Sequence, residues 1–302
     1  MAIAPDRAAP SAANADDGYG PIGRSEWMDI DWREHLRWVR VHRRWVNCVD
    51  IGEGPPLVFV HGLSGSWQNW LENIPHFART HRVIVPDLPG FGCSQMPSEK
   101  ISINGYARWL DELCARLELE STDIVGNSMG GFVAAEFALA FPQRVKRLAL
   151  VSAAGISTEQ QRNERMLVLL RKTEFVAIWL AGKTERAALR PGLRRFASFI
   201  FRHPERLPGP LIVEQARGGG KPGFIDALDA CTSYPLRERL SQISCPTLIV
   251  WGDSDRLVPL RDADVFEALI DGSRKLVYAD TGHVPQLERP ARFNRDVERH
   301  LA

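Results

Sequence analysis

The sequence has no long apolar run and almost no net charge. No segment approaches the roughly 18–20 consecutive apolar residues that a transmembrane helix needs. Lysine and arginine nearly balance aspartate and glutamate, which leaves a formal charge of +1 over 302 residues. Such a balance creates no electric field that favours nucleic acid over other partners. We therefore expect neither stable membrane insertion nor a nucleic-acid partner.

Cysteine is scarce and irregularly placed. The five cysteines are odd in number and scattered, at Cys48, Cys93, Cys114, Cys231 and Cys245. Their spacing argues against the disulfide framework of a secreted protein and offers no paired ligands for zinc. We expect reduced, mostly packed thiols and no metal site.

The first 24 residues lack the apolar h-region of a signal peptide. They are rich in alanine, proline, aspartate and glycine, a composition that buries too little apolar surface to fold. We predict a disordered tail over residues 1–24. Together with the reduced cysteines, this predicts a cytoplasmic protein.

Short apolar runs alternate with helical patterns along most of the chain. Strand-like patterns over 38–60 and 82–92 precede an amphipathic helix over 103–119. Further strands are expected at "DIVG", "VKRLALVSA", "PTLIVWG" and "RKLVYA", with helices between and after them. Short buried strands that alternate with helices predict an α/β fold, whose mostly parallel central sheet is covered by helices on both faces.

One stretch interrupts this alternation. From about residue 156 to 235 the short β-branched runs disappear and several helical patterns follow one another. Because the sheet pattern resumes afterwards, we expect an inserted helical cap rather than a second independent domain. The predicted organisation after the tail is a first core part over 25–155, a cap over 156–235 and a second core part over 236–302.

The segment "DIVGNSMGGFVAAEFALAFP" runs from an apolar stretch through glycines into a helical pattern. Within it, Gly126 and Gly130 flank Ser128 as G-x-S-x-G. Glycine is needed where a strand turns directly into a helix, because the backbones approach closely and the central residue is strained. Such a turn exposes the serine oxygen, and the N–H of Met129 at the helix start favours an anion. The alternative is that Ser128 is only a small residue in a tight connection.

A nucleophilic serine needs a base and an orienting carboxylate. His283 is the histidine that lies in a glycine-containing loop just after the last predicted strand, and Asp253 and Asp255 follow the strand "LIVWG". Because loops after parallel strands meet at one edge of a sheet, these residues can meet Ser128 there. An aspartate at such a position can also simply cap its loop.

The segment "FVHGLSGSW" also follows a predicted strand. Its glycine lets the loop fold against the serine turn, so the N–H of Leu63 can act as a second donor to an oxyanion. His61 in the same segment is interpreted as a buried brace of the loop rather than as a catalytic group.

These stretches together resemble the α/β-hydrolase-fold family. The matching segments are "HGLSGSW", "VIVPDLPGFGCS", "VGNSMGG", "WGDSDRLVP" and "GHVPQLERP", in family order over about 38–155 and 236–302. The resemblance implies Ser128 as the nucleophile, His283 as the base and Asp255 as the acid. Asp255 is preferred to Asp253 because the family pattern W-G-x-x-D ends at that position.

The resemblance also assigns supporting roles. It places Leu63 and Met129 at the two oxyanion-hole positions through their backbone N–H groups, and it implies a structural role for Asp87 in the "D-x-P-G-x-G" loop. Relatives that displace halide or open epoxides carry aspartate where this chain has Ser128. Serine therefore favours acyl transfer to water through an acyl-enzyme, with no metal and no organic cofactor.

The substrate is less determined than the mechanism. Carboxylic esters of small to medium apolar acyl or aryl groups are expected first, because Val284 and Pro285 follow His283 as in generic esterases and lipases. The alternative is cleavage of a carbon–carbon bond in ring-cleavage dienoic acids, since that branch of the family often shares "GNSMGG". Cap aromatics such as Phe175, Trp179 and Phe201 suggest an apolar pocket, or simply packing of the cap helices.

Two further interpretations stay open. The fold also carries non-catalytic receptors that capture a small apolar ligand, and some of them retain the triad. The segment "SEWMDIDWREHLRWVRVHRRW" mixes tryptophan with arginine, a composition compatible with contact at a membrane surface or simply with a strand of the sheet. The sequence does not determine the oligomeric state.

Overall fold

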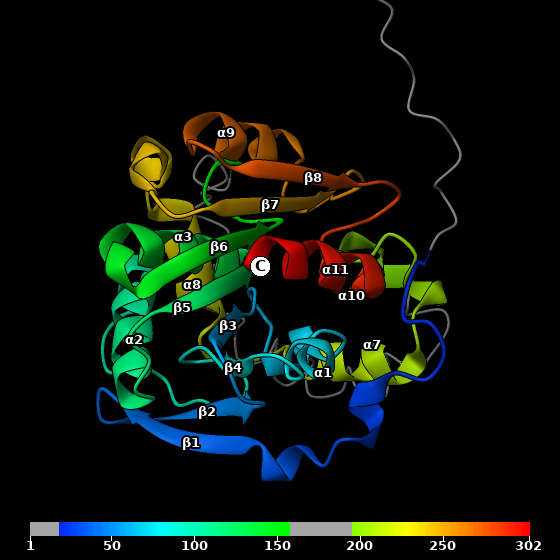
Figure 1. Ribbon diagram of the computed structural model, residues 1–302, viewed down its shortest axis with the longest axis horizontal. Helices are drawn as coiled ribbons and strands as arrows, with labels where there is room; N and C mark the ends of the chain where they lie inside the picture. The colour runs from blue at the N-terminus through cyan, green and yellow to red at the C-terminus, as the bar shows by residue number, and fades with distance from the viewer. Residues whose placement is uncertain (1–17, 158–194) are drawn as a thin grey trace, which may run out of the picture.

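The computed structural model describes residues 18–157 and 195–302. Its centre is an eight-stranded sheet in the order β1-β2-β4-β3-β5-β6-β7-β8 (Figure 1). The strands are β1 Leu36–Val41, β2 Arg44–Ile51, β3 Pro56–Val60, β4 Arg82–Pro86, β5 Thr122–Asn127, β6 Val145–Val151, β7 Thr247–Gly252 and β8 Arg274–Tyr278. From β4 to β8 all neighbouring strands are parallel, whereas β2 is antiparallel to both β1 and β4. The predicted α/β fold with a mostly parallel sheet is confirmed.

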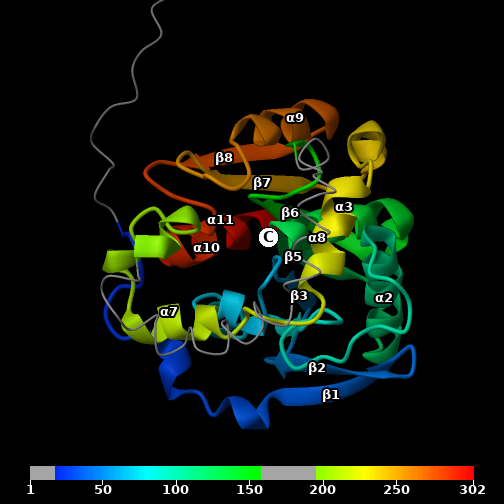
Figure 2. The ribbon, with the colours of Figure 1, turned by 180° about the vertical axis from the view of Figure 1, so that it is seen from behind.

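Helices cover both faces of this sheet. The described helices are α1 Ile74–Phe77, α2 Ile103–Arg116, α3 Met129–Ala140, α7 Gly209–Ala216, α8 Phe224–Ser233, α9 Arg261–Leu269, α10 Pro285–Glu288 and α11 Pro290–Leu301. Helices α10 and α11 lie in front of the sheet in Figure 1, whereas α2, α3 and α8 come to the front in Figure 2.

Alternate side chains along the strands pack into two separate hydrophobic cores, one on each face of the sheet. On β3, Val58 and Val60 pack in the cluster that contains residues of α2, α3 and α9, while Leu57 and Phe59 pack with α1 and α11. This is the period-two alternation of a strand that is buried on both faces. Each such side chain contributes about 1.5–3 kcal/mol by leaving water, so the two cores together fix the sheet that carries the candidate site.

Local sequence explains the two central helices. Helix α2 begins where the Ser102 hydroxyl accepts a hydrogen bond from the N–H of Gly105 at 3.2 Å, the usual N-cap arrangement. Helix α3 is buried on every side from Met129 to Ala138, and its one charged side chain in this range, Glu136, pairs with Arg239. It needs no polar face, because it lies between the sheet and α2.

The β1–β2 hairpin was not anticipated as a hairpin. The sequence indicates strand over this region, but the chain reverses at His42 and Arg43, which have φ of +44° and +66°. Two-residue hairpin turns of this kind usually contain asparagine and glycine, the residues that tolerate positive φ most easily. Neither is present here, so the turn gives no sequence signal. Trp38 and Trp45 on the hairpin are about half exposed, at 55% and 47%.

Between β6 and β7 the described elements are helices or 3₁₀ turns. Of the region in which several helical patterns were expected, residues 158–194 lie outside the described residues, and Arg195–Phe199 forms a 3₁₀ turn. Of the aromatic residues in the predicted cap, Phe201 is buried in the core and Phe199 is 63% exposed. Phe175 and Trp179 lie outside the described residues.

The structure differs from the predicted tail at its end. Residues 1–17 lie outside the described part of the chain, but Tyr19 is only 8% exposed and packs in the core beside α11. Gly20 donates its N–H to the carbonyl of Glu288 at 2.7 Å. The segment from residue 18 onward is therefore part of the folded body.

Candidate active site

Ser128 lies on a sharp turn between β5 and α3. Its φ of +56° and ψ of −120° are rare for any residue other than glycine. Three backbone hydrogen bonds hold it: its N–H donates to Val151, and its carbonyl accepts from Phe132 and Ala154, at 2.9, 3.1 and 3.0 Å. A strained position of this kind costs on the order of 1–3 kcal/mol, and persists because the surroundings fix it.

The glycines beside Ser128 are required by close packing. A Cβ atom on Gly130 would stand against the carbonyl oxygens of Val60 and His61, at 2.6 Å from the latter. A Cβ on Gly126 would collide with the backbone of Gly130 and Gly131. The G-x-S-x-G pattern therefore describes a real steric requirement, in which α3 starts directly on top of β3 and β5.

Asp255 and His283 meet at the carboxyl edge of the sheet, after β7 and β8. His283 Nδ1 lies 2.8 Å from Asp255 Oδ2, and their side chains are 6% and 0% exposed. The other oxygen of Asp255 accepts from the N–H groups of Leu257 and Val258 at 2.8 and 3.0 Å. Because the carboxylate accepts a hydrogen bond from Nδ1–H, the neutral ring has its lone pair on Nε2, which can accept a proton.

Asp253 occupies a different place from Asp255. It is exposed, and its Oδ1 accepts from the Ser254 hydroxyl at 2.9 Å and from the Thr281 N–H at 3.4 Å. These are the bonds of a residue that caps its own loop. Of the two aspartates, Asp255 is the one that contacts His283.

Asn127 joins the serine turn to the histidine loop. Its side-chain amide donates to the carbonyl of His283 at 3.2 Å and to that of Val151 at 3.0 Å. The sequence alone does not assign a role to Asn127. A signal was available, because an asparagine inside a fully buried strand must find partners for its amide, but the sequence cannot name those partners.

The loop after β3 packs against Ser128. A Cβ on Gly62 would be 3.1 Å from the Cβ of Ser128, so Leu63 follows directly at the serine turn. Met129, the other expected oxyanion-hole residue, is the first residue of α3 and is 1% exposed. The first N–H groups of a helix have no partner within it and favour an anion.

His61 holds this loop by both ring nitrogens. Its Nδ1 donates to the carbonyl of Gly62 at 2.8 Å, and its Nε2 accepts the N–H of Leu88 at 2.9 Å. Complete burial lowers the pKa of His61, although Asp87 and the Gly62 carbonyl oppose this. The neutral ring is the form that can accept from Leu88. These contacts agree with the prediction that His61 is a buried brace of the loop.

We expect His61→Ala to destabilise the fold by about 2–3 kcal/mol, because it leaves the buried N–H of Leu88 without an acceptor and opens a cavity. Urea unfolding followed by circular dichroism measures this. His42→Asn, at the exposed hairpin turn where asparagine tolerates positive φ, should stay within about 0.5 kcal/mol of the wild type. Equal stability of both variants would contradict the brace.

Asp87 is also structural by its contacts. Its two oxygens accept from the N–H of Trp67, the side-chain amide of Asn47 and the N–H of Cys93 at 2.8–2.9 Å. It thereby ties β2, the loop after β3 and its own loop together.

Among residues 18–157 and 195–302, no group of three or more His, Cys, Asp or Glu side chains is placed to hold a metal ion. Within the same ranges, no helix is long and apolar enough to span a bilayer.

Comparison with known proteins places the chain in a broad group. A family model described as "alpha/beta hydrolase fold" matches residues 55–290. The 2-hydroxy-6-oxo-2,4-heptadienoate hydrolase of Pseudomonas putida is 32% identical over 275 residues, which are 85% of this chain and 92% of the relative. A meta-cleavage product hydrolase from Pseudomonas fluorescens superposes with a TM-score of 0.68 at 25% identity, covering 88% and 97% of the two chains. A bacterial membrane phospholipase A gives 0.69 at 26% identity, covering 88% and 85%.

Proposed function

Because the chain belongs to the alpha/beta hydrolase fold family, we propose that it is a serine hydrolase with Ser128 as nucleophile, His283 as general base and Asp255 as the orienting carboxylate. The observation that carries the proposal is the buried 2.8 Å contact between His283 and Asp255. It stands at the same sheet edge as Ser128, and Asn127 links the two loops.

The reaction follows from these positions. The Oγ of Ser128 attacks a carbonyl carbon while His283 Nε2 takes its proton, and the resulting imidazolium is stabilised by Asp255. The N–H groups of Leu63 and Met129 hold the oxyanion. Collapse of the tetrahedral intermediate expels the leaving group, which takes the proton from His283. Water, deprotonated by His283, then releases the acyl group from Ser128.

For the substrate we place carbon–carbon cleavage of ring-cleavage dienoic acids first. This reverses the order reached from the sequence, which rested on Val284 and Pro285 after His283. The reversal is supported by the 2-hydroxy-6-oxo-2,4-heptadienoate hydrolase, which is similar over 92% of its own length, and by the superposed meta-cleavage product hydrolase.

Such a substrate suits acyl transfer once its enol has become a ketone. The enol proton moves to the carbon beside the distal carbonyl, and Ser128 attacks that carbonyl. The bond between the distal carbonyl carbon and the newly protonated carbon then breaks, and its electron pair is delocalised into the 2-oxo acid as a dienolate. The acyl group remains on Ser128 and leaves with water as a carboxylic acid. Ester hydrolysis uses the same steps with an alkoxide as leaving group, and is our second candidate because of the phospholipase neighbour.

We expect the purified chain to bleach a 2-hydroxy-6-oxo-hepta-2,4-dienoate with a kcat/KM at least about 100-fold above that for the best p-nitrophenyl ester of a short-to-long acyl series. The dienoate is the type of substrate that the named relatives hydrolyse, so we expect the site to bind its transition state more tightly than that of a p-nitrophenyl ester. Tighter binding of the transition state raises kcat/KM. Loss of dienoate absorbance and release of nitrophenolate measure the two reactions. The reverse ratio would assign the chain to the esterases.

A further inference from the structure

A buried carboxylate lies directly behind the His283 loop. Glu288, the last residue of α10, is fully buried, and its Oε2 accepts from the N–H of Gly282 at 3.0 Å. Its Oε1 lies 3.3 Å from the N–H of Val284. One carboxylate thus binds the residues on both sides of His283, which fixes the backbone from which the imidazole projects.

The same carboxylate also accepts hydrogen bonds from two segments elsewhere in the chain. Residues 200–203, in the middle of the predicted cap, come back against the core and are here called the cap return. The N–H of Arg202 in this segment donates to Oε2 at 2.8 Å, and the hydroxyl of Tyr19 donates to the same oxygen at 2.6 Å. Two residues before Arg202, the carbonyl of Ile200 accepts the N–H of His283 itself at 2.8 Å. Glu288 is therefore the junction of the N-terminal segment, the cap return and the histidine loop.

Tyr19 is held firmly in this junction. Its hydroxyl accepts the N–H of His203 at 2.8 Å while donating to Glu288. The guanidinium carbons of Arg206 and Arg289 lie 4.9 and 5.0 Å from its ring centroid, within the range of a cation–π interaction. A tyrosine with this many contacts is a fixed part of the folded body.

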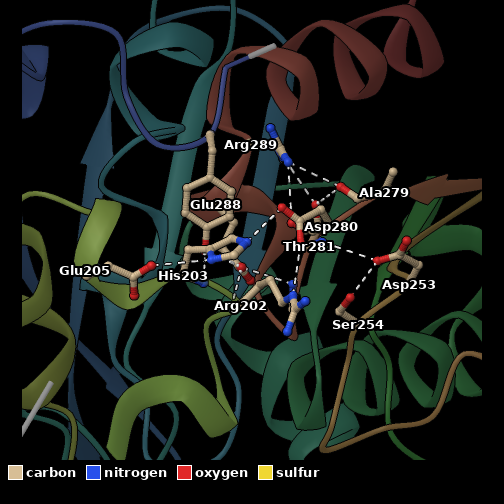
Figure 3. Close-up of polar contacts among 12 residues, drawn as sticks. Arg202, His203, Glu205, Asp253, Ser254, Ala279, Asp280, Thr281, Glu288 and Arg289 are labelled. Atoms are coloured by element: carbon tan, nitrogen blue, oxygen red, sulfur yellow. Dashed lines mark hydrogen bonds and ion pairs between the residues drawn. The ribbon is translucent and has the colours of Figure 1, made fainter. Parts of the chain in front are cut away.

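An outer layer of polar contacts surrounds the junction (Figure 3). Asp280 accepts from Arg202 Nε at 3.0 Å and contacts His203 Nε2 at 2.7 Å. Arg289 donates to the carbonyls of Ala279 and Asp280 at 3.3 and 3.4 Å. The entry to the histidine loop is thus tied to the cap return by side chains as well as by backbone.

We propose that Tyr19 and Glu288 are positioning residues for His283, so that the N-terminal segment takes part in aligning the catalytic base. The proposal rests on the proposed function, in which His283 is the general base. A displacement of the imidazole by a fraction of an ångström weakens proton transfer from Ser128, because transfer requires the heavy atoms within hydrogen-bond reach. Neither Tyr19 nor Glu288 contacts the reacting atoms; they act through the loop.

This arrangement requires an ionised Glu288. All four groups bound to it are donors, and a carboxylic acid would place its own proton against one of them. Burial raises the pKa of Glu288, and the hydrogen bonds from Tyr19 and from the three backbone N–H groups oppose the rise. The titratable and charged side chains around it are Tyr19, Arg202, His203, Arg206, Asp280, His283 and Arg289.

Removal of the Tyr19 hydroxyl should therefore change the dependence of activity on pH. One bond that favours the charged form of Glu288 is lost, so the pKa of that carboxyl rises further. Protonation of Glu288 then loosens the loop at a higher pH than in the wild type. The acid limb of the activity profile moves upward.

The test compares Tyr19→Phe with Tyr278→Phe in the full chain. Both variants lose a buried tyrosine–carboxylate hydrogen bond, since Tyr278 donates to Asp296 at 2.8 Å, but only Tyr19 bonds to the junction. The substrate-independent readout is the rate at which a fluorophosphonate labels Ser128. In that reaction the Ser128 oxygen bonds to phosphorus, fluoride leaves, and the serine proton passes to His283.

We expect Tyr19→Phe to lower the labelling rate and kcat about tenfold, with KM within about twofold and the acid limb raised by about one pH unit. Glu288→Gln should lower both rates further and remove the part of the pH dependence that comes from Glu288, and Tyr278→Phe should change only the melting temperature. Unchanged labelling and an unchanged pH profile in a folded Tyr19→Phe variant would overturn the proposal. A Ser128→Ala variant that is still labelled would instead overturn the proposed function.

Discussion

Ser128→Ala is expected to lower kcat on any hydrolysed substrate by at least about 10⁴-fold while the chain stays folded. The substitution removes the oxygen that forms the acyl-enzyme, and what remains is the residual contribution of substrate binding and the oxyanion hole. Steady-state turnover and covalent labelling by a fluorophosphonate measure the loss. Circular dichroism verifies the fold.

A neighbouring serine supplies a matched control. Ser152 follows β6 as Ser128 follows β5, has a φ of +44°, and is completely buried. Its N–H donates to Val250, just as that of Ser128 donates to Val151. Ser152→Ala should therefore show the effect of replacing a serine at a turn of this kind without removing the proposed nucleophile. Its turnover should stay within about threefold of the wild type. If Ser128→Ala binds ligand normally and the wild type shows no turnover, the chain is a receptor on a hydrolase fold.

Asp255→Asn is expected to lower kcat by about 10⁴-fold with little change in the structure. The amide oxygen can still accept from Leu257 and Val258, so the loop keeps its shape. The amide nitrogen then faces His283 and donates to Nδ1. The ring is driven into the tautomer with its proton on Nε2, which can no longer accept the proton of Ser128.

The control for this variant is two residues away. Asp253→Asn keeps the oxygen that accepts from Ser254 and Thr281 and does not touch His283, so kcat should stay within about twofold. Comparable losses in both variants would mean that the W-G-x-x-D assignment selects the wrong carboxylate. The kcat values of the two variants separate the two cases, because of these two aspartates only Asp255 contacts His283.

Much of the candidate site could be proposed from the sequence because its signals are local. A strand, a flanking pair of glycines and a helix around Ser128 occupy one short stretch of sequence. The loops that carry Asp255 and His283 each follow a strand, and parallel topology brings such loops to one edge. The α/β fold itself follows from the same alternation of apolar strands and helices.

The parts that could not be predicted depend on distant partners. Tyr19 and Glu288 are separated by 269 positions, and nothing near either residue indicates the other. Asn127 is equally uninformative until the loop of His283 is in place. The hairpin turn at His42 and Arg43 was missed for a different reason: its backbone conformation is set by strand pairing, against the local preference of both residues.

The chain leaves the sheet after Val151 and returns to it at Thr247, on two neighbouring strands that pair in parallel. The points of departure and return are thus pinned by the sheet, whatever the length between them. Closing a longer excursion costs little extra entropy, because that cost rises only with the logarithm of chain length. The fold therefore permits this stretch to be lengthened, shortened or exchanged over evolutionary time without altering the register of the strands.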